Sequence, residues 1–162
     1  MSKTSPVTSQ LPLPADMPLD APTHRGDRIR VLGPGSPRLL AFIPAAFTPV
    51  CGNEVKELVQ LSQRADQLGV QLLVASCDAP PTLAAWLHEV DPEAVLLGVS
   101  DHWPHGQIAR ACAAFDGQSG TACRHTWAIR ADGTRVLAAA CDAGEQRSME
   151  HHEYGLEWAA TS

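Results

Sequence analysis

Cys51 is the residue of this sequence whose type and position best suit nucleophilic chemistry. It follows a short apolar run, Arg38–Pro44, and stands where a helical pattern begins. The unpaired N–H groups and the positive dipole end of a helix start favour a thiolate over a thiol, and the thiolate is the form that attacks electrophiles. The sequence therefore predicts a reactive cysteine at position 51.

Two other residues are expected to stabilise this thiolate. A helix start supplies about 0.3–1 kcal/mol, whereas lowering the pKa of a thiol by two units requires about 2.7 kcal/mol. Thr48 lies three residues before Cys51, and its hydroxyl can donate to the sulfur or to an oxygen bound beside it. Arg124 begins a later strand, and its guanidinium would add a fixed positive charge and several donors.

These residues must be positioned by a sheet with helices packed against it. Short apolar runs predict strands at 27–32, 38–44, 70–75, 95–99, 125–129 and 135–140. Amphipathic runs predict helices at 51–68, 81–90, 105–114 and 148–160. Strands separated by helices predict parallel pairing, and Asp132-Gly133 predicts a final antiparallel hairpin. We expect a thioredoxin-like mixed α/β sheet flanked by helices, with Cys51 at its carboxyl end.

Length and composition indicate one globular domain. The chain has 162 residues, of which 44% are apolar and 19% charged. We expect a flexible arm at residues 1–22, which hold five prolines, and a single domain at 23–162. The net charge of −6 argues against a nucleic-acid partner, and no apolar run is long enough to span a membrane. Without a secretory signal pattern, we expect the protein in the cytoplasm, with reduced thiols.

The other cysteines and the histidines do not suggest a metal or another cofactor. The five cysteines are odd in number, widely spaced and lack a C-x-x-C pair, which argues against a zinc site. We expect Cys77 and Cys141 in the core. His151 and His152 are adjacent, and we expect both on the solvated surface, because neighbours on a helix do not share a face. His125, beside Arg124, is also expected to point outward.

The segment that contains Cys51 resembles the active-site segment of peroxiredoxins, the AhpC/TSA superfamily. Its residues 44–51 read PAAFTPVC and fit the pattern P-x-x-x-[TS]-x-x-C, in which Pro44, Thr48 and Cys51 match position by position. Glu54 matches the acidic residue that is common just after the cysteine.

Two later segments resemble the same family and appear in the same order. Residues 124–129, which begin with Arg124 and precede Asp132-Gly133, resemble the strand that carries the family's arginine. Residues 100–106 are SDHWPHG and resemble the SD-x-W-P-H-G stretch of the AhpE-type one-cysteine subgroup. The resemblance extends from about residue 26 to residue 158.

This resemblance implies a thiol peroxidase that reduces hydrogen peroxide or organic hydroperoxides. The Cys51 thiolate would attack a peroxide oxygen and become a sulfenic acid, while Arg124, Thr48 and backbone N–H groups stabilise the developing charge. Pro44 would shape the pocket. An external thiol would regenerate the enzyme: a thioredoxin-, glutaredoxin- or mycoredoxin-like protein, or a low-molecular-weight thiol. The resemblance also implies a homodimer.

Several positions depart from the family pattern. Cys112 stands where AhpE-type sequences carry Tyr, Cys123 directly precedes Arg124, and His125 replaces a small residue. Lys56 occupies the early helix position at which some peroxiredoxins carry a resolving cysteine. We therefore expect a one-cysteine cycle first, with an internal disulfide from Cys51 to Cys123, or to Cys112, as the rival.

Two further functions remain open, the second of them because of these departures. The protein could be a peroxide sensor or redox relay that uses the same oxidised cysteine. It could also be a thioredoxin-fold protein whose pocket serves a different, pathway-specific reaction.

Overall fold

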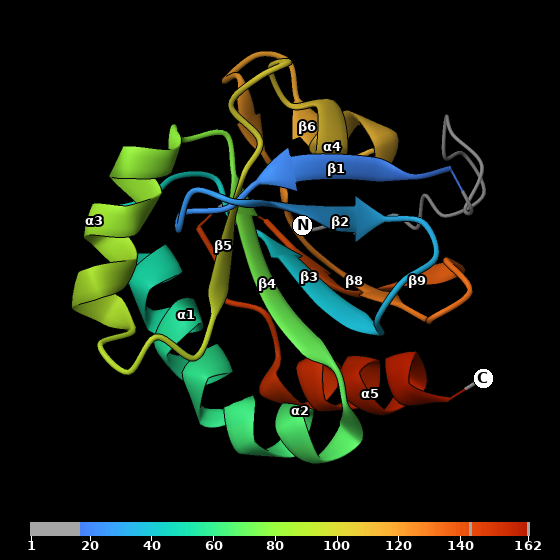
Figure 1. The fold of residues 1–162 in the computed structure, drawn as a ribbon. Helices are drawn as coiled ribbons and strands as arrows, with labels where there is room; N and C mark the ends of the chain where they lie inside the picture. The colour runs from blue at the N-terminus through green and yellow to red at the C-terminus, as the bar shows by residue number, and fades with distance from the viewer. Residues whose placement is uncertain (1–16, 143, 162) are drawn as a thin grey trace.

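A five-stranded mixed sheet forms the centre of the molecule, in the order β5-β4-β3-β8-β9 (Figure 1). The computed structural model describes residues 17–142 and 144–161. Strands β3 (Arg38–Phe42), β4 (Gln71–Ser76) and β5 (Leu97–Ser100) are parallel. Strands β8 (Arg124–Ile129) and β9 (Arg135–Cys141) extend the sheet in antiparallel pairing. The predicted mixed sheet and its final hairpin are confirmed.

Helices and a small second sheet cover the two faces of this sheet (Figure 1). Four helices pack on one face: α1 (Pro49–Gln60), α2 (Ser62–Leu68), α3 (Pro80–Val90) and α5 (Met149–Ala160). The other face carries α4 (Gln107–Ala111) and the antiparallel pair β1 (Leu19–Pro22) and β2 (Arg28–Leu32). A short hairpin of β6 (Phe115–Asp116) and β7 (Thr121–Ala122) follows α4.

Strand β3 is buried on both faces, which explains why all of its residues after Arg38 are apolar. Leu39 and Ala41 belong to the core under α1, α3 and α5, whereas Leu40 and Phe42 belong to the core under α4 and β2. This alternation follows from the two-residue period of a strand. Because both faces are covered, β3 fixes the start of the loop that leads to Cys51.

The helix predicted at 51–68 is divided into α1 and α2 at Leu61. The Leu61 N–H donates to the carbonyl of Leu58, 2.9 Å away, so the chain tightens there into a turn with three-residue spacing. Leu61 itself is buried in the core, which accounts for the continuous apolar pattern in the sequence. Gly69 ends α2 in a left-handed conformation, with φ of 72°, as expected for a helix stop.

The N-terminal segment differs in part from the flexible arm expected at 1–22. Leu19–Pro22 form β1, which pairs with β2, so the predicted edge strand at 27–32 belongs to a separate two-stranded sheet. Residues 1–16 of the expected arm lie outside the described part of the chain. Within that described part, none of the helices combines the length and the apolar character needed to cross a bilayer.

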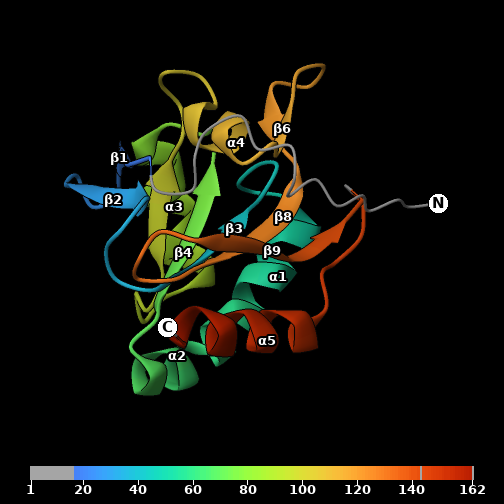
Figure 2. The same cartoon turned by 90° about the vertical axis from the view of Figure 1, so that its right-hand side faces the viewer.

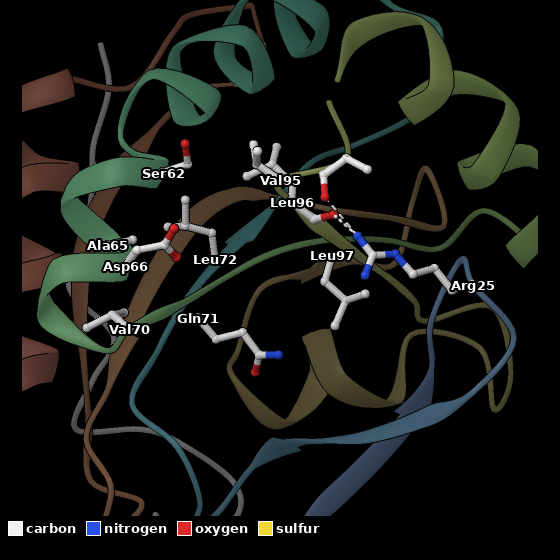
Figure 3. A pocket seen from close by; sticks show the side chains of 11 residues that line it. Arg25, Ser62, Ala65, Asp66, Val70, Gln71, Leu72, Val95, Leu96 and Leu97 are labelled. Carbon is white, nitrogen blue, oxygen red and sulfur yellow. Dashed lines mark hydrogen bonds between the residues drawn. The ribbon is translucent and has the colours of Figure 1, made fainter. Parts of the chain in front are cut away.

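A cavity of about 290 Å³ lies at the amino ends of β4 and β5 (Figure 3). Its polar lining includes Asp66, Gln71 and Arg25, whose guanidinium donates to the carbonyl of Ala94 at 2.9 Å. Cys51 follows the carboxyl end of β3, so this cavity and the cysteine lie at opposite ends of the parallel strands. The cavity is therefore not part of the site around Cys51.

Candidate active site

Cys51 lies in the first turn of α1, as the sequence predicts. The chain leaves the carboxyl end of β3, and Thr48 is the N-cap residue of the helix. Pro49 occupies the first helical position, where its missing N–H removes no hydrogen bond. Cys51 is fully buried, with 0% of its surface exposed. Its sulfur therefore lies in a low-dielectric environment, where nearby charges act strongly.

Arg124 contacts this sulfur directly. Its Nη2 atom donates to Cys51 Sγ at 3.3 Å, and only 4% of the side chain is exposed. The contact arises because β8 pairs with β3 in antiparallel fashion, so that the start of β8 arrives at the carboxyl end of β3. A guanidinium beside the sulfur favours the thiolate, because it supplies a permanent positive charge and a directed donor.

Glu54 connects this pair to a second arginine. It lies one turn after Cys51 on α1, and its Oε1 atom accepts from Arg124 Nη1 at 2.7 Å and from Arg147 Nη2 at 2.7 Å. Its Oε2 atom accepts from the Arg147 backbone N–H at 2.6 Å and from Arg147 Nε at 2.9 Å. The Glu54 carboxylate therefore orients the Arg124 guanidinium, whose Nη1 binds Glu54 while its Nη2 contacts the Cys51 sulfur.

The charge state of Glu54 follows from these contacts. Burial by itself raises the pKa of Glu54, but the hydrogen bonds and charge of Arg147, with the charge of Arg124, hold that pKa below its ordinary value. Glu54 is thus anionic at neutral pH and balances one of the two guanidinium charges. Glu54, Arg124 and Arg147 together therefore place one net positive charge beside the Cys51 sulfur.

Arg147 was not singled out in the sequence. Besides Glu54, it donates through Nη1 to the His125 carbonyl at 2.8 Å and to Thr126 Oγ1 at 3.1 Å. It directly precedes Ser148, the N-cap of α5, where the helix dipole disfavours a cation. That unfavourable position was the only sequence signal that Arg147 has an anionic partner elsewhere.

Thr48 and Pro44 lie in the loop beside Cys51. The Thr48 hydroxyl donates to the carbonyl of Ala45 at 3.0 Å. Because a hydroxyl has a single hydrogen, Thr48 in this arrangement donates to Ala45 and not to the sulfur, and its lone pairs remain able to accept. Its donation to a bound oxygen stays a prediction. Pro44 is half-buried just beyond the end of β3.

Asp78 is a second residue that the sequence did not reveal. Its Oδ2 atom accepts from the backbone N–H of Ala46 at 2.9 Å and from the Ser76 hydroxyl at 2.8 Å. These bonds hold the Cys51 loop against the end of β4. The same loop contains Phe47, whose φ of 64° is unusual for a non-glycine residue.

The two expected resolving cysteines occupy different environments. Cys112 is fully buried in the core under α4, on the opposite face of the sheet from Cys51, and burial raises the pKa of its thiol to about 12. Cys123 is half-buried just before β8, and burial together with Asp116 raises the pKa of its thiol. All five cysteines are free.

The expectations for the histidines require correction. His151 is exposed, but His152 is buried, with 2% of its surface accessible, because α5 packs against β8 and one of two adjacent residues must face the sheet. Its Nε2 atom lies 2.9 Å from Thr126 Oγ1. His125 is half-buried rather than outward-facing. In the described ranges no three metal-ligating side chains lie together.

Replacing His152 with Gln is expected to reduce the loss of stability in mild acid. Burial, with the charge of Arg147, lowers the pKa of His152 from 6.5 to about 4, so the unfolded chain binds its proton more tightly. As the pH falls from 6.5 to 4, the free energy of unfolding therefore decreases, by up to about 3 kcal/mol from this group. Urea unfolding of the unmodified protein and of His152→Gln, near pH 7 and at about pH 4.5, measures this decrease. Equal acid sensitivity in both proteins would contradict this prediction.

Comparison with known proteins gives consistent matches. The model of the AhpC/TSA family matches residues 20–136. Alkyl hydroperoxide reductase E of Mycobacterium bovis and Mycobacterium tuberculosis is 33% identical over 111 residues, which are 68% of this chain and 71% of that protein.

Solved structures agree with this match at the level of the fold. Enterococcus faecalis AhpC superposes with a TM-score of 0.73 and 24% identity, over 88% of both chains. A peroxiredoxin-like protein from Aquifex aeolicus superposes with a TM-score of 0.77 and 17% identity, over 88% of this chain and 84% of that one. At such identities the likeness shows the fold alone, and it confirms the thioredoxin-like architecture.

Proposed function

Because the chain belongs to the AhpC/TSA family, we propose that Cys51 is the residue with which it reduces peroxides. The protein is a thiol peroxidase, an oxidoreductase that consumes a peroxide and a thiol reductant. The observation that carries the assignment to Cys51 is the 3.3 Å contact between its sulfur and Arg124 Nη2 at a helix start.

The reaction begins with attack of the Cys51 thiolate on one peroxide oxygen. The new S–O bond forms as the O–O bond breaks, and the departing oxygen leaves as an alkoxide or hydroxide that takes up a proton. Arg124 and the unpaired N–H groups of the first turn stabilise the charge that develops on the two oxygens. The Thr48 oxygen accepts a hydrogen bond from the peroxide. Cys51 is left as a sulfenic acid.

Access to the sulfur requires a small movement of the loop. Cys51 is closed to solvent, so a peroxide reaches it only when residues 44–48 shift. Pro44 stiffens the start of this segment and excludes water from the bound peroxide. The Asp78–Ala46 hydrogen bond limits the shift and restores the closed loop.

We also propose the reductant, the domain, the location and the oligomeric state of this protein. An external thiol, either a thioredoxin-, glutaredoxin- or mycoredoxin-like protein or a low-molecular-weight thiol, returns the oxidised protein to its reduced form. Residues 23–162 form one domain, to which β1 also belongs through its pairing with β2. The five free cysteines suit the reducing cytoplasm. A homodimer would cover exposed aromatic surface, such as Trp103, which is 78% exposed.

Multiple-turnover peroxide consumption tests this function against the alternative of a sensor. With hydrogen peroxide and excess dithiothreitol, the protein is expected to consume many equivalents of peroxide per chain. A sensor that is oxidised once and regenerated slowly would consume little more than one equivalent in the same time. A thioredoxin-fold protein with a different reaction would consume peroxide no faster than the buffer that contains dithiothreitol alone.

A further inference from the structure

Cys141 lies much closer to the reactive site than its place in the sequence indicates. It is the last residue of β9, and its Cα partner in the antiparallel β8–β9 pair is Arg124. Residues that lie directly opposite in such a pair point to the same face, with Cβ atoms about 4.5–5.5 Å apart. Cys141 therefore sits beside the base of the side chain whose tip donates to Cys51 Sγ.

The electrostatic surroundings of Cys141 agree with this placement. Burial raises the pKa of its thiol, while the charges of Arg147 and Arg124 lower it and the charge of Glu54 raises it. Arg147, Arg124 and Glu54 are the charged groups of the Cys51 site, and the charge of Glu145, which follows β9, also raises this pKa. The sequence led us to expect Cys141 in the core, but the residue is half-buried.

The two cysteines that the sequence favoured lack this relation to the site. Cys112 lies on the other face of the sheet, and the acidic group that affects Cys123 is Asp116 of the β6–β7 hairpin. The charges of Arg135 and Asp101 act on the pKa of Cys112, and the charge of Asp116 raises the pKa of Cys123.

Cys141 lies at the end of an edge strand and is held there by a weak side-chain hydrogen bond. Strand β9 is the edge strand of the sheet, and the chain leads from its end to the start of α5 (Figure 2). The Cys141 thiol donates to the Glu145 carbonyl at 3.3 Å, a weak hydrogen bond. A disulfide requires Cα atoms within about 7 Å, and an approach of Cys141 to Cys51 brings the end of β9 towards the first turn of α1.

We propose that Cys141 is the thiol that resolves the oxidised Cys51, an inference that rests on the proposed peroxidase function. The Cys141 sulfur attacks the sulfur of the Cys51 sulfenic acid. An S–S bond forms and the S–O bond breaks, and the hydroxyl leaves as water with the proton of the Cys141 thiol. The external thiol reductant then reduces the Cys51–Cys141 disulfide and is itself oxidised.

Oxidation of the reduced protein by one equivalent of hydrogen peroxide tests this inference. The intact chain is expected to lose two of its five thiols, and a non-reducing peptide map should contain a linked pair of the Cys51 and Cys141 peptides. Cys141→Ser is expected to lose its first thiol as fast as the unmodified protein, but to retain a Cys51 sulfenic acid that dimedone labels. Cys123→Ser, a matched change at another half-buried cysteine, should still give the linked pair.

The outcomes separate this inference from the function on which it rests. A dimedone-reactive Cys51 in the unmodified protein, or a disulfide from Cys51 to Cys123, would overturn the role of Cys141 and leave the peroxidase function standing. If Cys51 is not oxidised in either the unmodified protein or Cys141→Ser, the proposed function itself fails.

Discussion

Replacing Cys51 with Ser is expected to abolish peroxide reduction and to leave the fold intact. The serine hydroxyl has nearly the same shape, but it is not ionised at neutral pH and is a far weaker nucleophile than a thiolate. Loss of a catalytic nucleophile typically lowers the rate by at least about 10⁴-fold. Peroxide consumption with excess dithiothreitol measures the loss, and far-UV circular dichroism with thermal unfolding checks the fold.

The matched control is Cys77→Ser, the same chemical change at a cysteine outside the site. Cys77 is half-buried, and burial with Asp101 and Asp78 raises the pKa of its thiol to about 11, so it remains protonated and unreactive. This variant should consume peroxide at nearly the unmodified rate. Substantial peroxide consumption by Cys51→Ser would mean that another cysteine performs the reaction.

Replacing Arg124 with Lys is expected to lower the rate constant of Cys51 oxidation by about 10²–10³-fold, the effect of losing one directed donor to a developing charge. The Arg124 guanidinium contacts Glu54 and Cys51 through two different nitrogen atoms. A lysine keeps the charge but has one nitrogen, so it cannot hold both groups in this geometry. Stopped-flow mixing of reduced protein with hydrogen peroxide measures the rate constant directly.

Arg147→Lys separates this catalytic effect from a loss of stability. Arg147 is as buried as Arg124 and binds the same carboxylate, but its described partners are Glu54, His125 and Thr126 and do not include the sulfur. Both variants should therefore unfold at lower urea concentrations, and only Arg124→Lys should show the large decrease in rate. Equal decreases in both rate constants would instead indicate that Arg124 acts through the fold alone.

Local patterns predicted the elements that carry the reactive cysteine. The apolar run of β3 and the helical period after Cys51 come from nearby residues, and Pro49 with Gly69 marks the limits of the helical region. Arg124 was found because its segment resembles a family pattern. Its contact with Cys51 depends on the pairing of β8 with β3, which involves residues more than 70 positions apart.

The residues that the sequence missed depend on contacts that no local pattern reveals. Cys141 lies near the Cys51 site because of the register in which β9 pairs with β8. Arg147 binds Glu54 from a loop whose sequence has no periodic pattern. His152 was misplaced because two adjacent histidines on a helix do not indicate which of them faces the sheet. Strand β1 was missed because Leu19–Pro22 is too short to show alternation and ends in proline.

The central claim is that Cys51 reacts as a thiolate held by Arg124 at the start of α1. The most direct measurement is rapid mixing of the reduced protein with one equivalent of hydrogen peroxide at neutral pH, followed by quenching and mass spectrometry of each cysteine peptide. We predict that Cys51 is oxidised first and many times faster than free cysteine under the same conditions. Oxidation of Cys51 no faster than free cysteine, or prior oxidation of another cysteine, would contradict the claim.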